Sequence, residues 1–365
     1  MKRKYLVITL YILFLAVLFE GTARIFFHIP QVNSRLMDHD LGWRHWWISR
    51  HKSSGEEIYY KFDVHDPTRG WKVKPGLRDM QVFDNKVLNS NSRGLRGIRE
   101  YAYEKQGDIT RILILGDSFT FGDEVSDHET YSYYLQEMLP ETEIINLGVH
   151  GYGHDQMLIL LQEEGIKYQP DIVILGFLPK DMSRNMLGFR DFAKPMFVLD
   201  DELVLKGVPV PTPEEVIKWD WLRPRIIDLF SALHHKARNM LGLYSSDMDL
   251  ITAAILEEMA NTSAGIRADP VFFYLPAGGD IFAGPGLMPG EKYLFSVCEG
   301  IGTVECFSAR PHFAARLAQG ETFKTVNHWG PTGHRAIAEA IRDYLVGAGH
   351  IPGQNGSHKQ PVINQ

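Results

Sequence analysis

Short apolar runs recur along the second half of the chain, with helical stretches between them. Four runs are clear and a fifth is weaker: 112–115, 144–147, 172–175, 271–275 and 303–307. Unbroken apolar runs of this length are typical of strands that are buried on both faces. The stretches with helical character are roughly 128–139, 154–167, 249–261 and 332–346. Alternating strands and helices predict an α/β domain over residues 111–348, with a parallel sheet covered by helices on both faces.

Three segments fall outside this alternation. Residues 29–110 are rich in Trp, Gly, Asp and Asn and contain many turn signals, so we expect a small β-rich or irregular lead-in. Residues 190–248 contain several prolines and an amphipathic stretch near 219–241. We interpret them as an insertion that covers part of the site, or as a plain surface excursion. Residues 349–365 are polar, and we expect a disordered tail.

The N-terminus determines the compartment. Three basic residues precede residues 5–19, which carry no charge. At about 1.5 Å per residue this run is shorter than a hydrocarbon core of about 30 Å, so it competes with a cleaved signal peptide. Glu20 and Arg24, however, stand where a cleavage site needs small neutral residues. We therefore expect an uncleaved signal anchor over residues 1–28: a single transmembrane helix in the inner or cell membrane, with a cytoplasmic N-terminus and a periplasmic main domain.

Composition excludes several classes of protein. The net charge is −7 and basic residues cluster only at the extreme N-terminus, which argues against nucleic acid as a partner. Cys298 and Cys306 are too few for a disulfide scaffold, and no Cys/His set has the spacing of a structural zinc site. The two cysteines either pair in an oxidising compartment or remain buried thiols. Nothing in the sequence requires a metal or an organic cofactor.

A Gly-Asp-Ser tripeptide, residues 116–118, follows the first apolar run. A serine at a tight turn from a strand into a helix presents its hydroxyl at the edge of the sheet, with its own backbone N–H available to an oxyanion. The pattern is not the GxSxG elbow, because Thr120 stands two residues after the serine. Asp-Ser pairs also form turns and helix caps. The position directly after a buried strand therefore makes Ser118 the candidate nucleophile.

A serine nucleophile needs a base, and the best candidate is His328. Pro331 suits the first turn of a helix, so His328 is expected in the loop just before that helix. His334 is expected inside the helix, where a packing role suits it better. Gly151 lies in a glycine-rich segment after the second apolar run and could donate its backbone N–H to the same oxyanion. A plain glycine turn is the alternative there, since the phosphate-loop spacing is absent.

Together, Ser118, Gly151 and the segment that contains His328 resemble the conserved blocks of the SGNH (GDSL) hydrolase family. The resemblance covers about residues 89–346, and residues 91–97 (Asn-Ser-Arg-Gly-Leu-Arg-Gly) look like the lead-in of membrane-anchored members. It implies a three-layer, flavodoxin-like α/β/α domain. It also implies an acyl-enzyme on Ser118, His328 as the base, and an oxyanion hole formed by the backbone N–H groups of Ser118 and Gly151.

Two positions depart from the family pattern. In the third block, Lys180 occupies the position of the asparagine that completes the oxyanion hole. A lysine could stabilise an oxyanion as a cation, and Asn185 is a nearby alternative. In the last block, no acid stands two or three residues before His328. The alternatives for the partner of its second ring nitrogen are a backbone carbonyl, Asn327, Glu321 and Asp280.

Three functions fit these observations. The first is a serine-dependent ester hydrolase that acts outside the cytoplasm on acylated, above all acetylated, carbohydrate or on another ester. The second is an O-acyltransferase that modifies a cell-envelope or exported polysaccharide, an alternative that rests on analogy with anchored members that carry a His-Trp segment. The third is a catalytically silent relative that binds glycan or acts as a scaffold, which the missing acid and Lys180 would explain.

Overall fold

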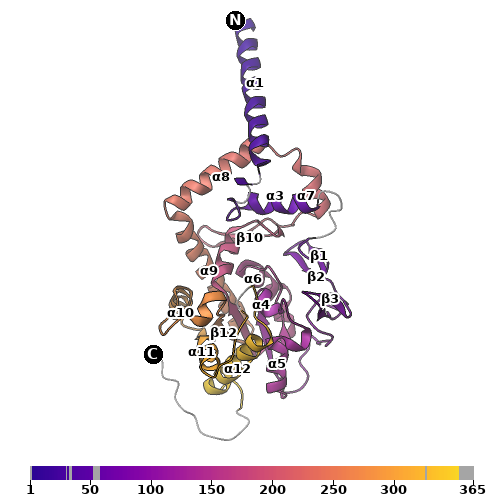
Figure 1. Cartoon of the computed structure of the whole chain (residues 1–365), viewed down its shortest axis with the longest axis vertical. Helices are drawn as coiled ribbons and strands as arrows, with labels where there is room; N and C mark the ends of the chain where they lie inside the picture. Colours follow the sequence, from indigo (N-terminus) through magenta and orange to yellow (C-terminus); the bar gives the residue numbers. More distant parts are fainter. Residues whose placement is uncertain (1, 30, 33–34, 52–57, 325–326, 353–365) are drawn as a thin grey trace. The chain divides into compact units, whose positions relative to one another are not determined.

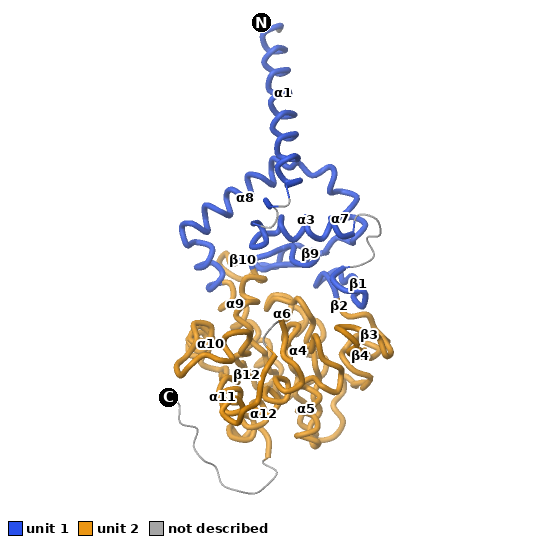
Figure 2. Tube along the Cα trace, viewed as in Figure 1, with its two compact units in different colours: residues 1–71, 186–198, 204–250 blue, residues 72–185, 199–203, 251–365 orange. Residues whose placement is uncertain are grey.

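The computed structural model describes residues 2–29, 31–32, 35–51, 58–324 and 327–352. The chain forms two compact units, which Figure 2 colours separately. Unit 1 comprises residues 1–71, 186–198 and 204–250, and unit 2 comprises residues 72–185, 199–203 and 251–365. The expected lead-in is therefore divided between the units at residue 71, and nearly all of the expected insertion belongs to unit 1. Most of the expected disordered tail lies outside the described residues.

Unit 2 contains a sheet of five parallel strands in the order β13-β12-β7-β5-β6. The bounds are β5 Thr110–Leu115, β6 Thr142–Asn146, β7 Ile172–Phe177, β12 Asp269–Tyr274 and β13 Glu305–Ser308. Numbered along the chain, this is the 2-1-3-4-5 order of flavodoxin-like sheets. The five apolar runs of the sequence are these five strands, so the predicted fold class is confirmed.

Helices cover both faces of this sheet (Figure 1). The helices of unit 2 are α4 Ser118–Phe121, α5 Tyr131–Met138, α6 His154–Glu163, α10 Pro289–Ile301, α11 Arg310–Ala318 and α12 Pro331–Ala348, together with most of α9 Leu243–Gly265. On one face, Ile112 and Ile174 pack in a core with Ile337 of α12. Leu113 and Val173 are equally buried, because alternate side chains of a strand point to opposite faces. Helices α6 and α9 form the layer on that second face, which makes three layers.

Helices α10 and α11 were not expected from the sequence. Helix α10 begins at a proline and ends at Gly302, whose φ of +70° suits a left-handed helix cap. Cys298 in α10 and Cys306 in β13 form a disulfide bond. Of the two alternatives left open for these cysteines, the structure has the paired one.

Unit 1 combines the start of the chain with residues 186–198 and 204–250. Its helices are α1 Lys2–Phe27, α3 Asp40–His51, α7 Pro213–Asp220 and α8 Arg225–Met240. Its short strands include β1 Asp63–Asp66, β8 Phe189–Arg190 and β9 Phe192–Ala193. Trp47 of α3 is fully buried, donates from its indole Nε1–H to the carbonyl of Ile58 and packs its ring against Phe192. The lead-in thus contains a helix that we did not expect, with Trp47 as a core aromatic.

Helix α1 has the length and composition of a membrane span. Among the described residues it alone meets these criteria, over Arg3–Phe27, with a mean hydropathy of 2.2. A signal sequence near an N-terminus would meet the same criteria. Large apolar side chains along its first part, such as Val7 and Phe14, are exposed.

Candidate active site

Ser118 is the first residue of the short helix α4, just past the end of β5. Asp117 caps the helix, because its carboxylate accepts a hydrogen bond of 3.0 Å from the backbone N–H of Phe119. A Cβ atom at Gly116 would overlap the side chain of Thr120, so the turn requires glycine there. These local features direct the chain from a buried strand into a helix with the serine at the turn. Ser118 is itself 6% exposed.

His328 lies in the loop before α12, as the sequence predicts. Its Nε2 is 2.7 Å from Oγ of Ser118. The neighbouring Trp329 holds the loop, since its indole Nε1–H donates to the carbonyl of Pro276 and its ring is buried. A Cβ atom at Gly333 would overlap the Trp329 ring, so glycine lets the loop pack close to the helix. The two residues chosen from the sequence as nucleophile and base are therefore in hydrogen-bond contact.

The other ring nitrogen of His328 faces Glu124, a residue that sequence reasoning missed. Its Nδ1 is 3.2 Å from Oε1 of Glu124, which also pairs with Lys324. Burial alone would raise the pKa of Glu124, but hydrogen bonds and charges from Lys324 and His328 outweigh it and lower the pKa. Glu124 therefore stays ionised at neutral pH. Ser118, His328 and Glu124 form the arrangement of a serine-histidine-acid triad.

The alternatives considered for the acid have other partners. Glu321 forms an ion pair with Arg316, 2.7 Å away. Asp280 accepts a hydrogen bond of 2.6 Å from the hydroxyl of Tyr274. Glu124 is separated from His328 by 204 positions, and nothing in its immediate sequence distinguishes it from other acidic residues. The one available signal was its position six residues after Ser118, in the loop that leaves α4.

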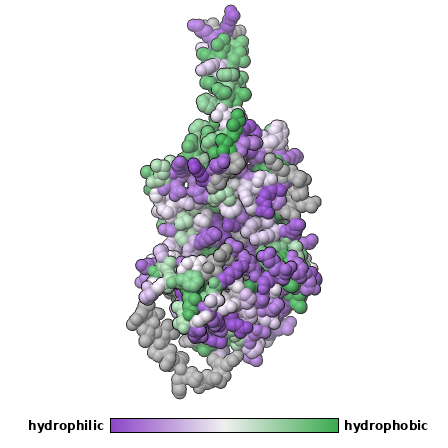
Figure 3. Space-filling model, in the orientation of Figure 1, coloured by the Kyte–Doolittle hydropathy of each residue, from purple (hydrophilic) through white to green (hydrophobic). Residues whose placement is uncertain are grey.

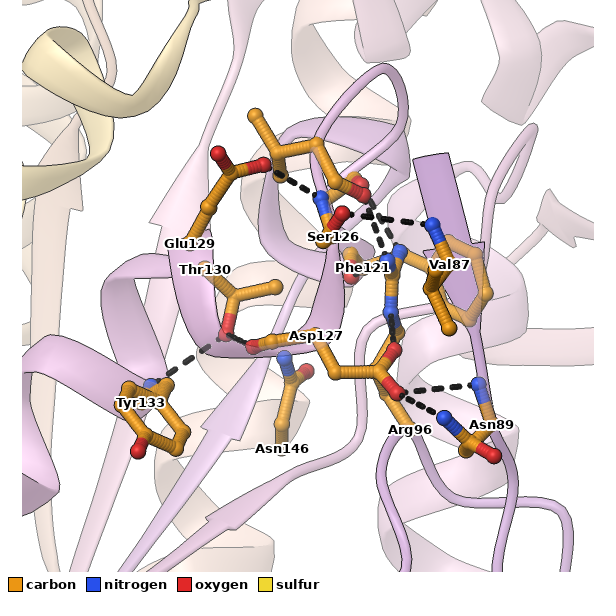
Figure 4. Close-up of polar contacts among 12 residues, drawn as sticks. Val87, Asn89, Arg96, Phe121, Ser126, Asp127, Glu129, Thr130, Tyr133 and Asn146 are labelled. Atoms are coloured by element: carbon orange, nitrogen blue, oxygen red, sulfur yellow. Dashed lines mark hydrogen bonds and ion pairs between the residues drawn. The ribbon is translucent and has the colours of Figure 1, made fainter. Parts of the chain in front are cut away.

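The buried side chain of Arg96 binds the backbone of the loop that contains Glu124 (Figure 4). The Arg96 guanidinium donates to the carbonyls of Phe121, Gly122 and Val125, and the Gly122 and Val125 contacts are 2.7 and 2.6 Å. Its Nε–H donates to the carboxylate of Asp127 at 2.7 Å. The Arg96 side chain is only 2% exposed. One buried guanidinium therefore binds the backbone on both sides of Glu124.

Glu124 needs this support because its backbone is strained. Its φ of +66° lies in the left-handed region, which is unfavourable for a residue with a side chain. Arg96 comes from the Asn-Ser-Arg-Gly-Leu-Arg-Gly segment that the sequence analysis singled out. Asp127 also accepts two hydrogen bonds from Asn89. The next residue, Ser90, forms an isolated β-bridge with Arg96. The lead-in segment thus forms part of the framework of the site.

The expected oxyanion-hole residues have different surroundings. Gly151 is buried in the loop between β6 and α6, with a φ of +76° that favours glycine. Lys180 is exposed in the 3-10 helix η3 Pro179–Met186. Asn185 is fully buried, and its amide contacts Thr252 at 2.9 Å and the backbone N–H of Asp155. Asn185 is thus engaged within the fold.

Arg184 is a second residue that sequence reasoning missed. It is buried, and its Nη1 is 2.7 Å from the carboxylate of Asp181 and 3.2 Å from that of Asp117. The same group donates to the carbonyl of Tyr152 at 2.8 Å. Arg184 therefore connects η3, the serine turn and the loop of Gly151. We read it as a positioning residue.

His334 lies inside α12 and is buried. Its Nδ1 accepts a hydrogen bond from the backbone N–H of Tyr131. Burial, with a smaller contribution from the charge of Arg96, lowers the pKa of His334 to about 3. His334 is therefore a neutral packing histidine. No group of three metal-binding side chains occurs in the part of the chain that the structure describes.

No protein-family model and no curated protein matches the sequence. Solved structures do match. TesA is 12% identical, with a TM-score of 0.39 over 65% of this chain and 98% of that chain. A G-D-S-L family protein from Desulfitobacterium hafniense is 14% identical, with a TM-score of 0.36 over 65% and 99% of the two chains. An acetylxylan esterase from Geobacillus stearothermophilus is 14% identical, with a TM-score of 0.38 over 66% and 95%. The chemistry assigned to this chain rests on its own contacts.

Proposed function

We propose that this chain is a serine-dependent ester hydrolase that works through an acyl-enzyme on Ser118. One observation carries the proposal: the continuous contact from Ser118 through His328 to Glu124, with distances of 2.7 and 3.2 Å. A serine hydroxyl is a weak nucleophile unless a base takes its proton. A carboxylate behind the histidine orients the ring and stabilises the imidazolium. The contact supplies both requirements.

The reaction follows from this geometry. Nε2 of His328 takes the proton of Ser118 as Oγ forms a bond to the ester carbonyl carbon. Nδ1–H donates to Glu124, which fixes the tautomer that leaves Nε2 free to accept. The tetrahedral intermediate collapses, the carbon–oxygen bond to the alcohol breaks, and His328 returns its proton to the departing alcohol. Water, deprotonated by His328, then hydrolyses the acyl-enzyme and regenerates the serine.

The negative charge of the intermediate needs donors near Ser118. We assign the backbone N–H groups of Ser118 and Gly151 to this role, since backbone donors in a buried turn are already oriented. Lys180 would add positive charge from an exposed position. An exposed ammonium is screened by solvent and loosely placed, so its contribution is the smaller one.

The substrate that we propose is an acylated carbohydrate or another ester outside the cytoplasm. The same acyl-enzyme would serve an O-acyltransferase if a sugar hydroxyl replaced water as the acceptor. The silent alternative loses its main support, because the acid that seemed to be missing is supplied by Glu124. Hydrolysis and transfer differ only in the acceptor.

We also propose that α1 is retained as a membrane anchor, with the rest of the chain in the periplasm. Ala23 and Phe27 at the end of α1 are buried within unit 1. The carboxylate of Glu20 accepts hydrogen bonds from the backbone N–H groups of Arg225 and Ile226. Removal of α1 as a signal peptide would break these contacts. The disulfide bond suits an oxidising compartment.

The test uses the purified full chain in detergent. A fluorophosphonate probe should label the wild type, and Ser118→Ala should abolish labelling together with hydrolysis of p-nitrophenyl acetate. His328→Ala should lower both by several orders of magnitude. Unchanged hydrolysis in Ser118→Ala would refute the proposal. Incubation of an acetylated with an unacetylated oligosaccharide then separates the two reactions: released acetate indicates hydrolysis, and a mass gain of the acceptor indicates transfer.

A further inference from the structure

Helix α8 packs one face against the rest of unit 1, and its opposite, apolar face is exposed. Arg225, Asp228 and Ala232 are buried on the inner face. The outer face carries large apolar side chains that no described residue covers: Ile227, Phe230, Leu233 and Met240, with exposures of 60, 65, 56 and 79%. Their spacing of three, three and seven residues follows the period of a helix. A soluble surface rarely exposes such a stripe without a partner.

The turn before α8 extends the stripe with aromatic residues. Trp219 at the end of α7 and Trp221 after it are 54 and 68% exposed, and Leu222 beside them is 48% exposed. Tryptophan is enriched where a protein meets the boundary between lipid and water, because its ring is apolar and its N–H is polar. The combination of an aromatic turn and an amphipathic helix is typical of segments that lie in the plane of a membrane surface.

Helix α8 is attached directly to α1. The Glu20 carboxylate accepts from the backbone N–H groups of Arg225 and Ile226, at 3.1 and 3.0 Å, and so caps the start of α8. Arg24 donates to the carbonyl of Trp221 at 3.0 Å. Both α1 and α8 belong to unit 1, and the contacts of Glu20 and Arg24 hold them together.

The length of α1 places this junction at the membrane surface. The charge-free residues 5–19 are fifteen in number and span about 22 Å at about 1.5 Å per residue. A hydrocarbon core is about 30 Å thick, so Glu20 stands at the level of the lipid headgroups or slightly below them. The first backbone N–H groups of α8 are bound to Glu20 and must lie at the same level. Ile25 and Phe26, past Glu20, are exposed and apolar as well.

Resting on the proposed anchor, the geometry points to a second membrane contact: the surface formed by Trp219, Trp221, Leu222 and the outer face of α8 lies in the outer leaflet of the membrane that α1 crosses. We call it the α8 surface. Figure 3 shows apolar atoms along α1 and around its base. A cavity of about 670 Å³ within unit 1 adjoins the surface, since Leu233 and Met240 line it together with Phe26.

A spin-label experiment on the full chain tests this contact. Both native cysteines are in the disulfide, so a new cysteine is the single free thiol. Nitroxide labels are placed by Phe230→Cys on the α8 surface, by Glu137→Cys at an exposed position of α5 in unit 2, and by Phe14→Cys in α1. The chain is reconstituted in vesicles of phosphatidylcholine and phosphatidylglycerol. Collision rates with oxygen, which partitions into lipid, and with a water-soluble nickel complex are compared.

We expect the ratio of oxygen to nickel collisions at residue 230 to approach that at residue 14, and to exceed that at residue 137 several-fold. A label at residue 230 that meets mainly nickel would show that the surface is in water. A label shielded from both reagents would show that protein covers it. Either result overturns the inference. Nickel access at residue 14 would instead refute the anchor, and fluorophosphonate labelling of Ser118 in each variant reports separately on the catalytic proposal.

Discussion

Glu124 and His328 are 204 positions apart in the chain, and their side chains meet at 3.2 Å behind the candidate nucleophile. The contact resolves a difficulty in the sequence, where the acid expected just before His328 is absent. Glu124 comes instead from the loop that leaves the nucleophile helix. The serine, at the start of α4, and its supporting acid, in the loop after α4, are thus six residues apart, and the base reaches both from another loop.

Substitution of Glu124 tests the triad. Glu124→Gln keeps the shape but removes the charge that orients the ring and stabilises the imidazolium, so kcat should fall by roughly 10²- to 10⁴-fold. The rate of p-nitrophenyl acetate hydrolysis measures this effect. Glu321→Gln is the matched control, since Glu321 pairs with Arg316, and it should stay near the wild-type rate. A large loss in Glu321→Gln with none in Glu124→Gln would assign the acid elsewhere.

Substitution of Arg96 tests whether the loop positions Glu124. Arg96→Lys keeps the charge but cannot bind three carbonyls and Asp127 at once, so Glu124 should shift. A displacement of about 1 Å in a catalytic group can cost on the order of 10²-fold in rate. We therefore expect kcat to fall by about 10- to 100-fold with little change in KM.

A matched control for Arg96 lies three residues further on. Arg99 is in the same segment, but its side chain is 47% exposed and pairs with Glu143. Arg99→Lys should leave kcat unchanged. If Arg96→Lys lowers the melting temperature but leaves kcat intact in the folded fraction, Arg96 serves stability alone.

Much of the fold could be predicted because its signals are local. Each strand of the sheet is a run of buried apolar residues, and a strand followed by Gly-Asp-Ser indicates a turn into a helix. Parallel strands place their carboxyl ends at one edge, so Ser118 and Gly151 could be expected near each other from the alternation alone. His328 followed from Pro331, which begins α12 as predicted.

The remaining parts of the fold and of the site depend on contacts between residues that are far apart in the sequence, and no local pattern predicts such contacts. The sequence contains 45 acidic residues, and only the folded loop brings Glu124 to His328. The cap of α8 is similar, because Glu20 precedes Arg225 by 205 positions. A lead-in expected to be β-rich or irregular also contains α3, whose helix is fixed by the burial of Trp47 among distant aromatic rings. In each case tertiary packing decides what the local sequence leaves open.

Lys180 can be tested against the backbone donors of the oxyanion hole. Its side chain is exposed, so Lys180→Ala should lower kcat by less than about tenfold, whereas loss of a preorganised oxyanion donor costs roughly 10²- to 10³-fold. Steady-state hydrolysis at low and high salt measures the effect, since a screened charge loses influence as salt rises. A salt-independent loss of 10²-fold or more would give Lys180 a principal role.

The stability of unit 2 should fall as the pH drops below about 6.5, because two of its histidines are buried in the neutral form. Burial lowers the pKa of His154 to about 3, and His334 has the same value. Between pH 3 and 6.5 the unfolded chain binds more protons at these residues than the folded chain does, so the free energy of unfolding decreases with decreasing pH. Because the unfolded histidine is half protonated at pH 6.5 and almost fully protonated at pH 5, each of the two residues should lower the free energy of unfolding by roughly 1 to 2 kcal/mol over this range.

Thermal unfolding at pH 7 and pH 5 checks this expectation. His334→Gln removes one titrating group, so the melting temperature should depend less steeply on pH than in the wild type, even though the variant starts from a lower value at pH 7. An equal slope in wild type and His334→Gln would mean that His334 takes up a proton in the folded state near its ordinary pH range. Its contact with the Tyr131 N–H would then be absent, since a protonated ring nitrogen cannot accept that hydrogen bond.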